Sequence, residues 1–350
     1  MLSNVFLYNR SITKSIRVED AVGTILCHDM TQIIPGVIKD AKFRKGHIIT
    51  KEDIPILLSM GKKNIYVYEM NENMIHENDA ALILCEMCIN DNMVATEVKE
   101  GKIELESKIK GFLHIDRERL LKANIYDDIA IATIKDGNVE IGERIAGMRV
   151  IPLVIEKEKL EKVKKSVGDK PLLSIHPYKI KSFGIVITGS EVYNGIIEDK
   201  FSDVIENKLK KYDVKLIDKI VCDDDKDMII AAITKLKNEG AELICCTGGM
   251  SVDPDDMTPA AIRDSGAKVL RYGTPFMPGA MFLLGYFDDG TPIMGLPGCV
   301  MYAKNTVFDV FLPKVLSKCE ISKDEFATLG YGGFCKKCKE CHFPNCTFGN

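Results

Sequence analysis

The sequence lacks the features that would place it in a membrane, outside the cell or on a nucleic acid. No stretch reaches the ~18 uninterrupted apolar residues of a membrane-spanning helix. The segment MLSNVFLYNR at the amino terminus lacks the charged start, apolar run and cleavage site of a secretory signal. A formal net charge of -4 supplies no field that would gather nucleic acid. We therefore expect a cytoplasmic protein with no membrane or nucleic-acid partner.

Internal repeats and low-complexity segments are also lacking, so disorder is not expected. Hydrophobic residues make up 46% of the chain and charged residues 28%, which are ordinary values for a soluble globular protein. At roughly 100 to 200 residues per domain, the 350 residues predict two or three domains. The composition changes only after Asp324, and four of the 12 cysteines lie in the last sixteen residues. We place this cysteine-rich tail at residues 319–350.

The first half of the chain indicates two small mixed units. Residues 1–77 are expected to form a β-rich module with one helix, for which Thr50 is the N-cap, with Asp53 three residues on. Residues 78–170 combine a helix with alternating segments typical of strands. They end in the charged stretch 156–167, which we interpret as a connecting helix with a solvated face.

Residues 178–318 differ, because apolar segments alternate with helical ones. The run FGIVIT at residues 183–188 is typical of a strand that is covered on both faces. Further strands are expected at 214–221 and 242–247, each followed by a helix. This alternation predicts an α/β fold with a doubly wound, mostly parallel sheet, preceded by the β-rich region and followed by the cysteine-rich tail.

Three polar loops follow these strands, at the edge where the ligand crevice of a parallel sheet lies. The third loop is the most informative, because Gly248 and Gly249 would let the backbone approach a ligand. The hydroxyls of Thr247 and Ser251 suit a phosphate. Two further glycine–proline clusters follow, around residues 273–280 and 295–299. For each cluster the alternative interpretation is a purely structural turn.

Three acids in these loops, Glu191, Asp223 and Asp256, would repel a phosphate unless a cation lay between them. Mg2+ bound by one or two carboxylates and by ligand oxygens resolves this conflict. The loops therefore indicate metal-assisted phosphoryl or oxyanion chemistry. Helix capping is the alternative for any one acid. We expect it of four others: Asp224, Asp225, Asp253 and Asp255.

These loops resemble the molybdopterin-binding domain shared by the molybdopterin adenylyltransferases and the molybdopterin molybdenumtransferases. The matching motifs are TGSEV at 188–192, the VCDDD loop, CTGGMSVDPDDMTPAAI at 246–262, MPGA at 277–280 and GLPG at 295–298. The Ser-Val after the glycine pair, the GLPG loop and the segment KGHIITKEDIPILLSMGKKNIYVYE are more similar to the molybdenumtransferase branch.

The resemblance implies Mg2+-dependent insertion of molybdate into adenylylated molybdopterin, with release of AMP. In that activity Glu191, Asp223 and Asp256 would be both the metal ligands and the catalytic residues. The resemblance also implies a homodimer. The residues that would bind the pterin are Thr188, Gly189, Ser190, Gly248, Gly249, Ser251, Pro278, Gly279, Pro297 and Gly298.

Two loops depart from the family pattern. Met277 and Ala280 stand where the family usually has lysines, and Cys299-Val300 replaces Asn-Pro after GLPG. Loss of two desolvated cations would weaken anion binding by roughly 1 to 3 kcal/mol each. A non-catalytic carrier or sensor of the cofactor is therefore a second hypothesis. A nucleotide pyrophosphatase, as in the competence-damage-like proteins that this domain resembles, is a third.

The tail spaces its thiols as C-x2-C-x2-C-x4-C, with His342 beside the third. This pattern is close to the C-x2-C-x2-C-x3-C run of iron–sulfur proteins. Tetrahedral Zn2+ is equally compatible, since four thiolates can meet at ~2.3 Å from one ion. We expect metal binding by one of the two, and unpaired thiols are the alternative. If the metal is an iron–sulfur cluster, the tail would be a redox element or would dock a molybdoenzyme or maturation partner. The expected ligands are Cys335, Cys338, Cys341 and Cys346.

Overall fold

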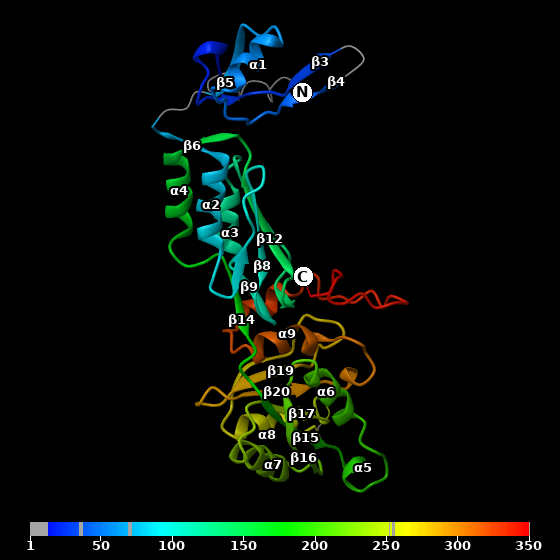
Figure 1. The fold of residues 1–350 in the computed structure, drawn as a ribbon. Coiled ribbons are helices and arrows are strands. Elements are labelled where there is room, and N and C mark those ends of the chain that lie inside the picture. Colours follow the sequence, from blue (N-terminus) through cyan, green and yellow to red (C-terminus); the bar gives the residue numbers. More distant parts are fainter. Residues whose placement is uncertain (1–12, 35–37, 69–71, 252, 254–255, 350) are drawn as a thin grey trace.

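The computed structural model describes residues 13–34, 38–68, 72–251, 253 and 256–349. Figure 1 shows three units stacked in chain order, and the carboxyl-terminal tail lies near the junction of the second and third. In this part of the chain no helix is long and apolar enough to cross a membrane. The units are called the amino-terminal unit, the middle unit and the α/β domain below.

The amino-terminal unit is β-rich, as expected, and has one α-helix. Its three-stranded antiparallel sheet has the order β1-β5-β2, and a separate hairpin pairs β3 with β4. The prediction of Thr50 as the N-cap is wrong, because α1 begins at Asp53 and its N-cap is Glu52, which makes no side-chain capping hydrogen bond. The Asp53 carboxylate instead accepts hydrogen bonds from the backbone N–H of Thr50 (2.8 Å) and from its hydroxyl (2.9 Å). The elements are β1 (Thr13–Arg17), a 3-10 turn (Val18–Asp20), β2 (Ile25–Leu26), β3 (Met30–Ile34), β4 (Ile38–Phe43), α1 (Asp53–Ser59) and β5 (Asn64–Tyr68).

The middle unit packs three helices on a four-stranded antiparallel sheet of order β10-β12-β8-β7. Leu160, Val163 and Val167 of the charged helix are buried in this core, so its apolar stripe is structural and its charged face is solvated. The elements are β6 (Met74–His76), α2 (Glu77–Cys88), β7 (Met93–Ala95), β8 (Lys102–Ser107), β9 (Gly111–Ile115), α3 (Arg117–Asn124), β10 (Ile129–Thr133), β11 (Gly137–Val139), β12 (Arg144–Val150), β13 (Val154–Glu156), α4 (Lys157–Val167) and β14 (Leu173–Pro177).

The α/β domain is built on a six-stranded sheet of order β16-β15-β17-β20-β19-β18. The first four strands are parallel, and β19 and β18 add an antiparallel pair at the far edge. The elements are β15 (Ser182–Thr188), α5 (Ser190–Tyr193), α6 (Phe201–Lys210), β16 (Lys215–Cys222), α7 (Lys226–Asn238), β17 (Ile244–Thr247), α8 (Thr258–Asp264), β18 (Lys268–Tyr272), β19 (Leu283–Tyr286), β20 (Pro292–Leu296), a 3-10 turn (Gly298–Val300), α9 (Val307–Leu316) and α10 (Lys323–Thr328).

Both faces of this sheet are covered. Side chains of α6 and α9 pack on one face with Ile185 and Met294, and side chains of α7 and α8 pack on the other with Val186 and Ile244. Every residue of β15 from Phe183 to Thr188 is buried, as a doubly covered strand requires. The prediction of a doubly wound, mostly parallel sheet is confirmed.

The tail folds back onto the α/β domain. Residues 333–335 form a short bridge with Met277, through a hydrogen bond from the Met277 N–H to the Gly333 carbonyl (2.7 Å) and one from the Cys335 N–H to the Met277 carbonyl (2.9 Å). The ring of Phe348 packs on that of Phe276, with 4.5 Å between centroids. The tail therefore closes over the loop that precedes β19.

Candidate functional site

The expected crevice lies where four parallel strands end together. The register pairs Thr188 with Cys222, and Thr247 with Leu296. The last residues of β15, β16, β17 and β20 therefore lie together at one edge of the sheet, the edge formed by the carboxyl ends of the parallel strands. The loops after these strands begin at that edge, together with the loop that leads into β19. The structure thus brings together the loops that the sequence predicted as neighbours.

The turn after β17 can be made only by glycine. Gly248 has φ 83°, and a Cβ placed on it would lie 2.0 Å from the carbonyl oxygen of Thr188. Gly249 has φ 50°, and its Cβ would lie 2.9 Å from the hydroxyl oxygen of Thr258. The chain crosses the end of β15 with no room for a side chain, which leaves backbone as the surface of the turn.

Three threonine hydroxyls lie beneath this turn. The Thr188 hydroxyl lies 3.2 Å from the Thr247 carbonyl oxygen and 3.1 Å from the Thr258 hydroxyl oxygen. The Thr247 hydroxyl is buried and has no hydrogen-bond partner among the described residues. An unpaired buried hydroxyl costs free energy unless a ligand or water satisfies it. Thr258 was not among the residues predicted from the sequence.

A second cluster ties the loop after β15 to the loop after β16. The Ser190 hydroxyl donates to the carboxylate of Asp223, and the Ser190 N–H donates to Asp224 at 3.0 Å. The Asp223 carboxylate accepts hydrogen bonds from the Ser190 hydroxyl and from the Asp224 N–H. These two bonds, the Ser190 one first, hold the pKa of Asp223 below its ordinary value. Asp223 is therefore set to stay ionised at neutral pH.

The capping predictions have mixed outcomes. Asp225 caps α7 by accepting from the Met228 N–H at 2.8 Å, as expected. Asp224 is not a helix cap, because its carboxylate binds Ser190 of another loop instead, so that prediction is wrong. The Asp253 N–H donates to the Asp256 carboxylate at 3.1 Å, within the loop before α8. Asp255 lies outside the described residues.

The three predicted catalytic acids lie in loops at this one edge but do not form a closed set of ligands. Glu191 is exposed on the short helix α5. Asp256 lies near the glycine turn, since its Oδ1 is 3.6 Å from where a Cβ on Gly249 would be. Within the described ranges, no three Asp, Glu, His or Cys side chains are grouped so that they could hold a metal ion. Any metal here would need ligand oxygens to complete its coordination.

The remaining residues predicted to bind the pterin lie in the loop before β19, in the loop after β20 and just after the glycine turn. Gly279 has φ 131° and packs on the start of α9, where its Cβ would meet Val307 at 2.5 Å. Pro297 precedes the 3-10 turn that begins at Gly298. Ser251 is exposed, and its carbonyl accepts from the Tyr272 hydroxyl at 3.1 Å.

The tail supplies cations at this side that the motifs did not indicate. A pocket of about 520 Å3 is lined by Pro278, Lys304, Lys336 and Lys337, among others. Met277 itself is exposed and stands where the family usually has a lysine. No local pattern could indicate that residues 336–337 return to this loop, because the bridge from Met277 to Phe334 spans more than fifty residues of chain.

Two family models match the chain. Residues 184–318, which hold every loop of the edge, match the family described as "Probable molybdopterin binding domain". The chain contains a molybdopterin-binding domain. Residues 15–69, in the amino-terminal unit, match "Domain of unknown function (DUF8806)".

Curated relatives match part of the chain. A CinA-like protein of Mycobacterium sp. (strain MCS) is 35% identical over 79 residues, which cover 23% of this chain and 19% of that protein. A CinA-like protein of Mycobacterium tuberculosis (strain ATCC 25618 / H37Rv) is 36% identical over 75 residues, covering 21% and 17%. The chain thus spans about a fifth of the length of the curated relatives it matches.

Solved structures superpose on this chain with low TM-scores. The tungsten cofactor synthesizing protein MoaB from Pyrococcus furiosus has a TM-score of 0.31 and 22% identity, covering 35% of this chain and 85% of that one. The molybdopterin biosynthesis moea protein from Pyrococcus horikosii has a TM-score of 0.32 and 14% identity, covering 87% and 75%. Overlap at this level carries no further argument.

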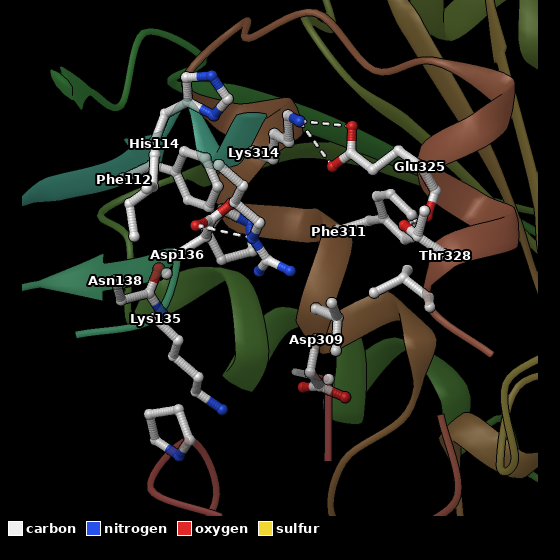
Figure 2. A pocket seen from close by; sticks show the side chains of 18 of the residues that line it. Phe112, His114, Lys135, Asp136, Asn138, Asp309, Phe311, Lys314, Glu325 and Thr328 are labelled. Carbon is white, nitrogen blue, oxygen red and sulfur yellow. Dashed lines mark hydrogen bonds and ion pairs between the residues drawn. The ribbon is translucent and has the colours of Figure 1, made fainter. Parts of the chain in front are cut away.

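A second cavity, of about 460 Å3, lies between the middle unit and the molybdopterin-binding domain. Lys314 and Glu325 form an ion pair on its wall, with 2.6 Å between the Lys314 nitrogen and each carboxylate oxygen (Figure 2). The middle unit contributes Asp136 to the wall, and burial raises the pKa of this carboxyl. Its Oδ1 lies 3.7 Å from the Nε of Arg117. No sequence motif pointed to this cavity, because its walls come from separate units.

We expect replacement of Ser190 with alanine to raise the pKa of Asp223 toward its ordinary value of 3.8. In the native protein the lowered pKa favours folding above that value, and this contribution is lost as the pH falls through the folded-state pKa. Carbon-detected NMR titration of the aspartate carboxyls measures the shift. Ser265→Ala is the control, because its hydroxyl donates to the Ile262 carbonyl and touches no acid. An unchanged Asp223 titration in Ser190→Ala would show that this hydrogen bond is not formed in solution.

Proposed function

We propose that the domain binds molybdopterin at the shared edge of the sheet and inserts molybdate into adenylylated molybdopterin in the presence of Mg2+. In this reaction the two dithiolene thiols would bind molybdenum while one molybdate oxygen leaves as water with their protons, and a second water would cleave the pyrophosphate bond, releasing AMP and leaving the phosphate on the pterin. The acids that hold Mg2+ would be Glu191, Asp223 and Asp256. Bound Mg2+ would neutralise the charge that develops on the phosphate oxygens.

The observation that carries the proposal is the glycine turn at Gly248 and Gly249. Because no Cβ fits against Thr188 or Thr258, a ligand at this turn would meet main chain and not a side chain. Main-chain N–H groups at the end of a parallel strand are suited to an anionic group such as a pterin phosphate. The buried Thr247 hydroxyl offers one further group without a partner among the described residues.

The arrangement of the acids supports Mg2+ over a protein-caged metal. Hydrogen bonds from the Ser190 hydroxyl and the Asp224 N–H hold the pKa of Asp223 below its ordinary value, and Asp256 lies beside the glycine turn. Mg2+ is usually held by one or two carboxylates together with substrate oxygens, and it keeps several waters. An open set of acids that a phosphate ligand completes is consistent with that preference.

A second candidate is a non-catalytic carrier of the cofactor. It is favoured by Met277 and Ala280, which replace the two lysines that the family usually presents to the anion. Lys304, Lys336 and Lys337 lie around the same loop and offset this loss in part. The enzyme and the carrier share the binding site and differ only in turnover.

The test is release of AMP from adenylylated molybdopterin by the purified protein with Mg2+ and molybdate. We expect turnover that stops when Mg2+ is chelated, and a decrease of roughly 100-fold or more in Asp256→Ala. The matched control is Asp288→Ala, since Asp288 is exposed in the turn between β19 and β20 and forms an ion pair with Lys268.

Three results separate the hypotheses. Tight pterin binding without AMP release, unchanged in Asp256→Ala, would establish the carrier. Cleavage of ADP-ribose in place of AMP release would establish the pyrophosphatase. No pterin binding by the native protein would remove both of the leading functions.

A further inference from the structure

The cavity between the middle unit and the α/β domain, shown in Figure 2, is large enough for a small organic ligand. Its volume is about 460 Å3, within the range of roughly 300 to 1,000 Å3 that is typical of ligand pockets. One wall comes from β9 and the turn before β11, and another comes from α9 and α10. Phe343 and Pro344 of the tail also line the cavity. None of the residues predicted to bind the pterin does so, and a ligand here would occupy a separate site.

Asp136 brings to this cavity a carboxylate whose hydrogen-bonding capacity is not used. Its Oδ1 is buried and has no hydrogen-bond partner among the described residues. The Nε of Arg117 lies 3.7 Å away, which is too far for a hydrogen bond. The side chain keeps 25% of its surface exposed, so the carboxylate is not sealed inside the protein. An N–H donor bound beside it would satisfy an acceptor that the chain leaves open.

His114 lies next to this carboxylate and has a free ring nitrogen. The register of β9 with β11 pairs Leu113 with Gly137, so the next residues along the two segments, His114 and Asp136, lie across from each other. The Nδ1 of His114 is buried and has no partner among the described residues. The last torsion of a histidine or aspartate side chain is soft, so a ligand could reorient both groups at low cost. Two neighbouring polar groups are therefore available to one ligand.

The lysines in the wall already have partners. Lys314 binds both carboxylate oxygens of Glu325 at 2.6 Å. Lys135 donates to the Cys346 carbonyl at 3.1 Å, and its ammonium nitrogen lies 6.0 Å from the centre of the Phe343 ring. The group that lacks a hydrogen bond is thus an acceptor, which favours a donor or a cation over an anion as the ligand.

We propose that this cavity binds a small organic cation that carries a planar N–H donor group, such as an amidine or a guanidine, on an apolar body. A planar pair of N–H donors matches the two oxygens of a carboxylate, here those of Asp136. The apolar body would lie against Phe112 and Phe311, whose rings line the cavity. The inference does not rest on pterin binding or on molybdate insertion, because the two sites share no predicted residue.

The test is titration of the full chain with benzamidine, followed by protein NMR and by calorimetry. Benzamidine joins a planar amidinium group to an aromatic ring, and we expect it to bind with a Kd of about 1 mM. Benzoate and benzyl alcohol have the same ring with an anionic or a neutral group. Both should bind at least about 10-fold more weakly, because neither presents a pair of N–H donors to the carboxylate.

Two variants locate the binding. Asp136→Asn keeps the size of the side chain and removes its charge, so we expect the affinity for benzamidine to fall about 10-fold. Thr328→Trp fills the cavity from α10 without changing Asp136, and it should abolish binding. Asp127→Asn is the control, since Asp127 is exposed in the same unit and lies outside the cavity. Circular dichroism of each variant confirms that it folds.

Any of three outcomes would overturn the proposal. Benzamidine that binds equally well to the native protein, to Asp136→Asn and to Thr328→Trp would bind elsewhere. Benzoate that binds as tightly as benzamidine would make the cavity an anion site, and benzyl alcohol that does so would make it merely apolar. Native protein that binds no benzamidine at about 10 mM, ten times the expected Kd, would leave the cavity without this ligand class.

Discussion

Replacement of Gly248 with alanine is expected to lower the free energy of unfolding of the domain by about 2 to 4 kcal/mol and to abolish pterin binding. The residue has φ 83°, which penalises any Cβ, and its Cβ would lie 2.0 Å from the Thr188 carbonyl oxygen. A backbone oxygen in the last residue of a buried strand cannot move aside as a flexible side chain can. The turn must therefore shift, and the ligand surface shifts with it.

Gly240→Ala is the control that separates the cost of the contact with Thr188 from the cost of a side chain at positive φ. Gly240 has φ 90°, but nothing lies within 4 Å of the Cβ that would be added. We expect it to cost about 1 kcal/mol and to leave pterin binding unchanged. Urea unfolding and calorimetric titration of both variants provide the comparison. Equal losses of stability, with binding intact in both, would refute the role assigned to the Thr188 contact.

The second large effect is expected at Lys208, which joins α6 to the start of α9. Its ammonium group pairs with Asp309, and it donates to the Lys304 carbonyl at 2.9 Å. The two paired side chains are only 11% and 12% exposed. Lys208→Met would leave the Asp309 carboxylate largely buried without its cation, so we expect a loss of about 3 kcal/mol in unfolding free energy.

Lys210→Met is the matched control, because Lys210 lies on the same helix and is exposed. A change within about 0.5 kcal/mol is expected there. In Lys208→Met we also expect the segment that contains Lys304 to exchange its amide protons faster, as measured by mass spectrometry. If both variants unfold at the same urea concentration as the native protein, the pair does not stabilise the domain.

The features predicted correctly from the sequence are those that a local pattern determines. The buried run before Thr188 and the glycines after Thr247 mark strand ends within a few residues, and parallel topology then places those ends at one edge. The capping of α7 by Asp225 follows in the same way from a short polar side chain before a helix.

The features that the sequence left undetermined depend on contacts between distant segments. Asp224 looked like a cap because it precedes a helix, yet Ser190 of another loop provides its partner. The return of Phe334 to Met277 and the gathering of Cys299 with the tail thiols depend on tertiary packing alone. Spacing identified four candidate ligands, but it could not show what surrounds them.

Hydrogen bonds attach the tail to three segments that lie far from it in the chain. It is bonded to Lys135 in the middle unit, to Met277 before β19 and to Asn305 before α9. A ligand that binds only the docked tail would stabilise the docked state as a whole by the free energy that docking lends to the binding of the ligand. Loss of any one of the three attachments would therefore weaken the binding of such a ligand.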